Sequence, residues 1–270
     1  MRINFKYSYI LDLVYHIFAH IKVNNASDLY DENYINPALF SQLSEISDYY
    51  NVNFNRLAPI QFILTHAETV DDVSDVLLNN TQFTDNDKQF FIIPFINILR
   101  SEDESYSAYW NEINNKNQFE AEISEKFSEL KWLFEKYNKD IDIYLSYSIT
   151  KNGRGIYSPN KYQAVVPYPF HVNPRYDVNH CFYIAFHEIT HQITDNMIRS
   201  DINMDDGSHD LSEKIVILAD YYWLNDKTAY LRWISELFGC DEILTAEKFA
   251  EIFKVPKDIN DKILQECINK

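Results

Sequence analysis

The segment Cys181–Ile193 reads CFYIAFHEITHQI and holds two histidines four residues apart, with a glutamate directly after the first. On an α-helix a step of four residues is about 400°, so the imidazoles of His187 and His191 lie one turn apart on the same face. Both rings can then coordinate one Zn²⁺ at about 2.0–2.1 Å. Glu188 is rotated by about 100° from His187, where it can act as a general base on a water molecule held by the metal rather than as a ligand.

The residues around this motif favour a helix that packs on a core with its other face. Apolar side chains recur there at helical spacing, namely Phe182, Phe186, Ile189, Ile193 and Met197. Such a stripe holds the helix against the core while the histidine face borders a cleft. The competing interpretation is an ordinary helix with packed or surface histidines, because the bare pattern is short enough to arise by chance.

A second pair of histidines, His16 and His20, has the same spacing but a different neighbour. Ile17 follows the first histidine, so no acid is placed to serve as a general base. We therefore expect His16 and His20 to be structural residues of an amphipathic helix, with their ring nitrogens hydrogen-bonded.

The stretch 184–193 resembles the active-site helix of the zincin metallopeptidases, which carries the HExxH pattern, and a more general similarity extends over 141–225. In the zincin pattern, strands precede the active-site helix and a second helix follows it. The resemblance implies a zinc-dependent peptidase with His187 and His191 as ligands and Glu188 as general base. It also points to a poorly characterised bacterial group with zincin-like features.

Catalytic zinc takes three protein ligands and a water molecule, so a third ligand is needed. In metzincins it is a histidine six residues after the second, but Met197 stands there. In gluzincins it is a glutamate on a following helix, and Glu213 lies 22 residues after His191 near the start of such a helix. Asp210 and His209 are alternative ligands, and Asp210 with Glu213 also fits a capping box.

Asp220 lies seven residues after Glu213 and therefore on nearly the same helix face. A carboxylate there can accept the free N–H of a zinc-bound histidine and fix its tautomer. Gluzincins of the thermolysin type place this aspartate four residues after the ligand, where this chain has Ile217, so an acid on the helix surface is the alternative. Asp195 continues the histidine row by one turn and is expected to be a solvated acid.

The implied reaction is hydrolysis of a peptide bond in a peptide or protein substrate, with Glu188 moving a proton from water to the leaving amine. A further donor for the oxyanion is expected near the cleft, and four residues remain open for this role: Tyr157, Tyr168, Tyr176 and His209. The alternative function is a non-catalytic zincin-like helical module that binds other proteins.

Hydrophobic periodicity predicts an α+β fold that is predominantly α-helical. Only 4 glycines occur, which disfavours a hairpin-rich β protein. Alternating residues predict a small sheet of about three strands packed on the active-site helix, with strands at 2–10, 141–149 and 162–166. Pro167 and Pro169 favour an edge position for the last strand, where an extended peptide could add to the sheet. The run 151–155 is expected to be a turn.

Helical spacing predicts helices at 11–23, in several pieces from 37 to 138, and at 178–198, 210–225, 228–238, 245–253 and 257–268. Three starts carry a capping-box pattern: Thr69/Asp72, Thr84/Asp87 and Ser101/Glu104. Pro94 is expected to kink or break a helix near 88–99, and 116–138 is predicted to be one long amphipathic segment. The chain thus divides into a mostly helical region, 1–140, whose N-terminal strand can join the sheet, and a zincin-like catalytic core with C-terminal helices, 141–270.

The chain carries 41 acidic and 24 basic residues in 270, a formal net charge of −17. Such a charge repels phosphate backbones and anionic lipid, so we expect neither a nucleic acid nor a membrane partner. No signal peptide or membrane-spanning run is recognised, and the three cysteines form no CxxC pair, so a cytoplasmic protein with reduced, mostly buried thiols is expected. The sequence does not indicate an oligomeric state.

Overall fold

Four strands form one sheet in the order β1-β2-β4-β3. The strands are β1 (Ile3–Lys6), β2 (Asp140–Ser146), β3 (Arg154–Ile156) and β4 (Lys161–Pro167). β1 and β4 both run parallel to β2, whereas β3 is antiparallel to β4. β1, from the first region of the sequence, pairs with β2 from the second, so the N-terminal strand joins the sheet as the sequence allowed. The sheet therefore contains strands from both sides of the boundary expected at residue 140.

The computed structural model describes residues 2–21, 34–114, 118–171, 173–198 and 208–267, without the side chains of 196–198 and 208–209. The first part of the chain forms α1 (Tyr9–Ile21), α2 (Pro37–Val52), α3 (Phe54–Leu57), η1 (Ala58–Gln61), α4 (Val70–Asn79), α5 (Asp85–Asp87), η2 (Lys88–Ile92), α6 (Ile93–Ile113), α7 (Glu120–Ser128) and α8 (Lys131–Tyr137). The last part forms α9 (Val178–Ile198), α10 (Ser208–Trp223), α11 (Lys227–Leu237), α12 (Ala246–Ile252) and α13 (Lys257–Cys267). The predicted fold class, predominantly helical α+β, is therefore confirmed.

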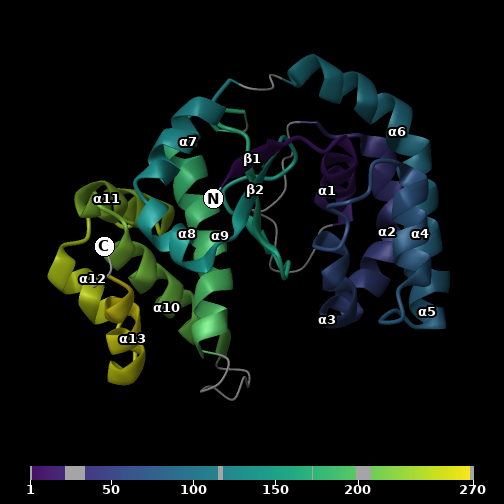
Figure 1. Ribbon diagram of the computed structural model, residues 1–270. Helices are drawn as coiled ribbons and strands as arrows, with labels where there is room; N and C mark the ends of the chain where they lie inside the picture. Colours follow the sequence, from purple (N-terminus) through teal and green to yellow (C-terminus); the bar gives the residue numbers. More distant parts are fainter. Residues whose placement is uncertain (1, 22–33, 115–117, 172, 199–207, 268–270) are drawn as a thin grey trace.

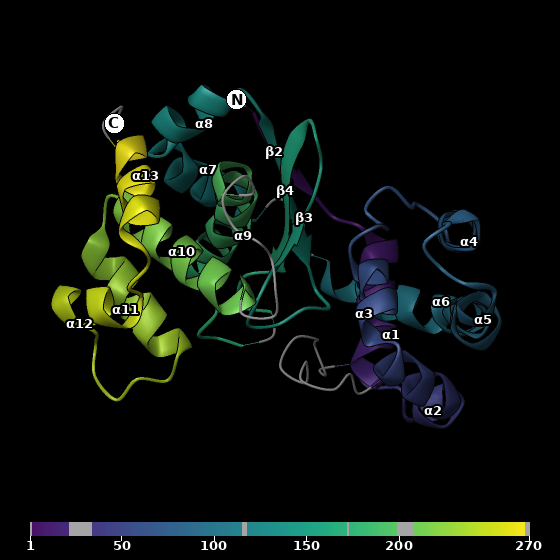
Figure 2. The same cartoon turned by 90° about the horizontal axis from the view of Figure 1, so that it is seen from below.

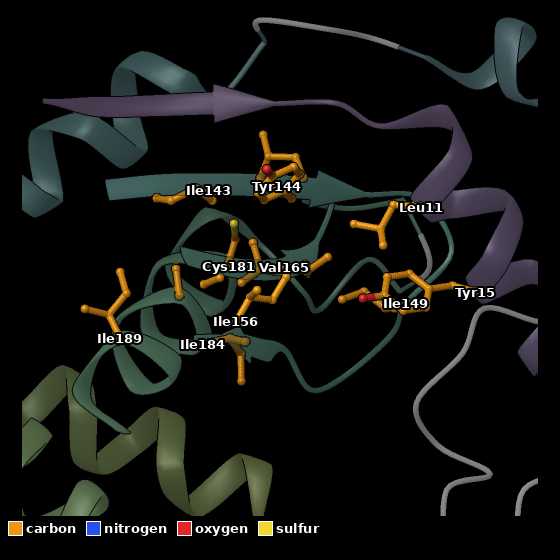
Figure 3. Packing of buried hydrophobic residues seen from close by; sticks show 14 of the residues in the cluster. Leu11, Tyr15, Ile143, Tyr144, Ile149, Ile156, Val165, Cys181, Ile184 and Ile189 are labelled. Carbon is orange, nitrogen blue, oxygen red and sulfur yellow. The ribbon is translucent and has the colours of Figure 1, made fainter. Parts of the chain in front are cut away.

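The sheet lies between two groups of helices. Figures 1 and 2 show α7–α13 on one side of the strands and α1–α6 on the other. Buried side chains from α1, β2, β4 and α9 gather around the sheet in one hydrophobic cluster, which includes Tyr15, Ile143, Val165 and Ile189 (Figure 3). α9 packs directly on β4 and β3, so the helix that carries both histidines of the motif is fixed to the sheet.

The strand prediction for 2–10 was too long, because a helix cap interrupts it. β1 ends at Lys6 and α1 begins at Tyr9. Ser8 accepts hydrogen bonds from the backbone N–H of Leu11 and Asp12, the first through its hydroxyl and the second through its carbonyl oxygen. This hydroxyl satisfies a free N–H of the first helical turn, which favours helix over continued strand.

The predicted turn at 151–155 contains the start of a strand, so the sheet has four strands rather than about three. β3 pairs with β4 through residues Arg154–Ile156. β4 is consequently an interior strand, and the predicted edge position for 162–167 is wrong. Pro167 is tolerated because it is the last residue of β4, where the loss of an N–H costs little. The edges of the sheet are β1 and β3.

The helical region before residue 140 agrees with the predictions in part. The capping boxes at Thr69/Asp72 and Thr84/Asp87 are both present. The box at Ser101/Glu104 is wrong, because α6 already runs through it and the Ser101 hydroxyl donates to the carbonyl oxygen of Ile98. Pro94 lies in the first turn of α6, directly after the π-helical segment η2.

The segment 116–138 is two helices rather than one. α7 and α8 are separated at Leu130, which is buried, and its backbone N–H bonds the carbonyl oxygen of Phe127 in a tight turn. α7 packs on α9, and Phe134 of α8 contacts the rings of Phe186 in α9 and Tyr162 in β4.

His16 and His20 are buried and hydrogen-bonded, as expected for structural histidines. His16 Nε2 lies 3.2 Å from a carboxylate oxygen of Glu102, and His20 Nδ1 lies 2.8 Å from the carbonyl oxygen of His16. The second ring nitrogen of His20 accepts from the backbone N–H of Asn36. Within the described residues, no helix combines the length and apolar composition needed to cross a membrane.

Candidate metal centre

The helix that carries the motif, α9, is capped at one end and buried along one side. Asp177 precedes it and accepts a hydrogen bond from the backbone N–H of His180 at 2.9 Å, which satisfies the first turn. The stripe predicted from the sequence is buried as far as it is described: Phe182, Phe186, Ile189 and Ile193. Phe182 and Phe186 meet rings of Phe127 and Phe134 from α7 and α8. This packing leaves the face with His187 and His191 only partly covered.

The second helix of the site, α10, crosses α9 and brings two acids to the histidines. Its body is anchored by a buried run that starts at Ile215 and ends at Ala219. α10 begins at Ser208, so Asp210 lies inside the first turn, exposed, and is not the N-cap. The capping-box interpretation of Asp210 with Glu213 is therefore wrong.

Three ligand atoms converge between the two helices. The Nε2 atoms of His187 and His191 lie 3.2 Å apart. Oε2 of Glu213 lies 3.4 Å from Nε2 of His187, and Oε1 of the same carboxylate lies 3.3 Å from Nε2 of His191. Two ligands at about 2.05 Å from a tetrahedral zinc ion are about 3.3 Å apart. Each of these three contacts is thus close to the spacing of two ligands on one zinc ion, and the Glu213 carboxylate spans the two histidines with its two oxygens. Among the described residues, His187, His191 and Glu213 form a group that could hold a metal.

Asp220 orients the first of these histidines. Its side chain is completely buried, and Oδ2 lies 3.0 Å from Nδ1 of His187. The same oxygen accepts a longer bond of 3.5 Å from the hydroxyl of Tyr230. An aspartate at this place keeps the proton on Nδ1, so the lone pair of Nε2 faces Glu213 and His191. The two-turn spacing between Glu213 and Asp220 puts both acids on the side of α10 that faces α9.

The electrostatics of the cluster favour a bound positive charge. Burial lowers the pKa of the His187 imidazole, but hydrogen bonds to Asp220 and Glu213 outweigh burial and raise its pKa to about 10. Burial raises the pKa of Glu213, whereas hydrogen bonds from His187 and His191 hold it well below its usual range. Two acids therefore stabilise a cation between the histidines, either a proton or a metal ion that displaces it.

Glu188 faces β3, at the edge of the sheet next to the ligand cluster. A Cβ atom built on Gly155 would lie 3.1 Å from a carboxylate oxygen of Glu188 and 3.1 Å from its carbonyl oxygen. A Cβ on Gly153 would lie 3.0 Å from Cγ of Glu188 and 2.5 Å from a methyl of Ile184. Only glycine lets β3 approach α9 this closely, so half of the chain's glycines serve to seat Glu188.

Sequence reasoning missed several residues that fix the site. Gly153 and Gly155 were interpreted only as turn residues. Gln192 donates through Nε2 to the carbonyl oxygen of Gln163 at 2.8 Å and accepts from its N–H at 3.2 Å, which ties α9 to β4. His180 Nε2 lies 2.8 Å from the carbonyl oxygen of Lys151, which ties α9 to the loop before β3. Helical spacing could have indicated that both residues lie near the motif, because Gln192 lies four residues after Glu188 and His180 lies seven residues before His187.

The remaining sequence candidates lie elsewhere or outside the description. Tyr157 is exposed, Tyr168 is buried with its ring stacked on Tyr147, and Tyr176 stacks on His180. No oxyanion donor is singled out by these positions. Asp195 is partly buried at the next turn of α9. The side chains of Met197 and His209 lie outside the described residues.

Comparison with known proteins adds no identity. A scan against protein-family models and searches of the curated proteins and of the solved structures gave no significant match.

Proposed function

We propose that this protein is a zinc-dependent metallopeptidase of the zincin type, with His187, His191 and Glu213 as metal ligands. The observation that carries the proposal is the convergence of these three side chains: the two Nε2 atoms lie 3.2 Å apart, and the two oxygens of Glu213 lie 3.4 and 3.3 Å from them, close to the ligand spacing of tetrahedral zinc. Two imidazoles and one carboxylate are a donor set that zinc takes in hydrolytic enzymes.

The number of ligands favours a catalytic site over a structural one. Structural zinc is closed by four protein ligands, whereas catalytic zinc keeps one position open. Among the described residues, three ligand atoms meet at this point. Asp210, the alternative third ligand, is exposed at the start of α10 and is not part of the group.

Glu188 and Asp220 have separate roles in the proposed hydrolysis. When bound, zinc supplies a Lewis acid that lowers the pKa of a water molecule and polarises the scissile carbonyl. Glu188 accepts the proton from that water and delivers it to the leaving amine as the C–N bond breaks. Asp220 holds the Nδ1 proton of His187, so that the ring keeps its orientation throughout.

The substrate in this proposal is a peptide or protein, and neither nucleic acid nor a membrane takes part. The net charge of −17 supports the exclusion of polyanions. A cytoplasmic location belongs to the same proposal, and cysteines that form no disulfide among the described residues are compatible with a reducing compartment. Cys181 is buried but Cys240 is exposed, so the expectation of mostly buried thiols holds only in part.

The test is cleavage of a mixed peptide library by the zinc-loaded protein, followed by mass spectrometry. Wild type is expected to cut, and Glu188→Gln is expected to keep its zinc but lose about 10²- to 10⁴-fold in rate, the usual contribution of a general base. Equal rates for wild type and Glu188→Gln would overturn the assignment of the base. If the zinc-loaded wild type cuts nothing, the peptidase is rejected in favour of a zincin-like interaction module.

A further inference from the structure

Arg154 lies between the two glycines that seat Glu188. Successive residues of a strand point to opposite faces, so Gly153 and Gly155 face α9 while Arg154 points to the other face of the sheet. There it meets the end of η1, where its guanidinium lies 5.9 Å from the ring centre of Phe62. Because β3 is an edge strand, an extended peptide added to it by strand pairing would lie along Arg154 and Gly155.

Within the part of the chain that the structure describes, the hydrogen-bond partners of this guanidinium are neutral. Nη1 donates to the carbonyl oxygen of Gly153 at 3.1 Å, and Nη2 lies 3.5 Å from the side-chain oxygen of Gln61. Nε is buried and has no hydrogen-bond partner. Among the described residues, no carboxylate forms an ion pair with Arg154, whereas three other arginines are each paired with an aspartate, namely Arg2, Arg56 and Arg100.

Gln61, the neutral side chain beside Arg154, is fixed by hydrogen bonds. Gln61 is buried, its Nε2 donates to the hydroxyl of Tyr50 at 2.7 Å, and its carbonyl oxygen accepts from the hydroxyl of Tyr15 at 3.0 Å. This arrangement leaves the side-chain oxygen of Gln61 toward Arg154. Neutral groups thus hold Arg154 in place, although the chain has 41 acidic residues.

We propose that Arg154 binds a carboxylate of the substrate, either an Asp or Glu side chain close to the scissile bond or the C-terminal carboxylate of the peptide. This inference rests on the proposed peptidase function and names its substrate class. Guanidinium matches a carboxylate with two parallel hydrogen bonds, and the pairing is strongest where no other anion competes. The net negative charge slows the approach of acidic peptides, but salt screens it beyond about 8 Å, so recognition on contact is set by Arg154.

Binding can be measured without turnover in the zinc-loaded Glu188→Gln protein. The probes are fluorescent decapeptides in which one glutamate is moved through a neutral glutamine background, together with one all-glutamine peptide made with a free and with an amidated C-terminus. Fluorescence anisotropy gives Kd for each. We expect one glutamate position, or the free C-terminus, to bind about tenfold to a hundredfold more tightly than its neutral counterpart.

Arg154→Gln in the same background is expected to abolish that preference, whereas Arg100→Gln, which removes the same charge on a surface pair with Asp71, is expected to retain it. Arg154→Glu is expected to reverse the preference toward peptides with lysine at the same position. Circular dichroism before titration establishes that each variant is folded.

Two results overturn the inference: equal Kd values for acidic and neutral peptides, or a preference that survives in Arg154→Gln. A failure of the proposed function has a different signature. In that case the acidic preference depends on Arg154, but the zinc-loaded wild type leaves the bound peptides uncut.

Discussion

Removing the charge of Asp220 is expected to weaken zinc binding, although Asp220 is not itself a ligand. Oδ2 of Asp220 accepts from Nδ1 of His187 at 3.0 Å in a fully buried setting. A hydrogen bond to a charged group contributes about 1.5–3 kcal/mol and a neutral one about 0.5–1.5 kcal/mol. Asp220→Asn keeps a neutral acceptor, so the loss is about 1–1.5 kcal/mol, or roughly tenfold in Kd. Asp220→Ala removes the acceptor altogether and is expected to cost up to about a hundredfold.

Competition with a fluorescent zinc chelator at neutral pH measures these affinities. Asp210→Asn is the matched control, because it removes the same charge from the exposed first turn of the same helix. We expect its Kd to stay within about twofold of wild type, as is usual for a screened surface charge. If Asp220→Ala binds zinc as tightly as wild type, or if Asp210→Asn loses as much as Asp220→Asn, the reasoning from the His187 contact is refuted.

Two further predictions concern the supports of the site in metal-free protein. Burial lowers the pKa of His180 to about 4, below the value of about 6.5 in the unfolded chain. The neutral imidazole therefore contributes about 3 kcal/mol to the free energy of unfolding above pH 6.5, and this contribution is lost as the pH falls from 6.5 to 4. Urea denaturation across this range should give a flatter pH dependence for His180→Asn, and an unchanged slope would contradict the assignment. Gly153→Ala puts a methyl group 2.5 Å from Ile184 and 2.9 Å from the carbonyl oxygen of Val165. We expect this variant to lose about 1–3 kcal/mol in the free energy of unfolding. If it is as stable as wild type, β3 can move away from α9.

The part of the site that lies on one helix was predictable from the sequence. His187, Glu188 and His191 depend only on helical periodicity, which the apolar stripe of α9 independently indicates. The convergence of Glu213 and Asp220 depends on how α10 crosses α9. That crossing is set by packing between residues distant in sequence, so spacing alone left Asp210 and His209 as open alternatives.

The fold shows the same division between local and distant effects. The capping boxes at Thr69 and Thr84 were predictable because hydroxyl and acid lie within one turn. β3 was not, because its three residues include a glycine and show no alternation. Its strand form depends on pairing with β4 and on contact with Glu188, neither of which the sequence of the segment contains. The interior position of β4 was missed for the same reason.

The central claim is that His187, His191 and Glu213 hold one zinc ion, and anomalous diffraction from crystals at the zinc absorption edge tests it most directly. We predict a single strong peak about 2.0–2.2 Å from both Nε2 atoms and from a Glu213 carboxylate oxygen. Zinc-soaked crystals with no peak between these three side chains, or with the ion bound at Asp210 instead, would contradict the account.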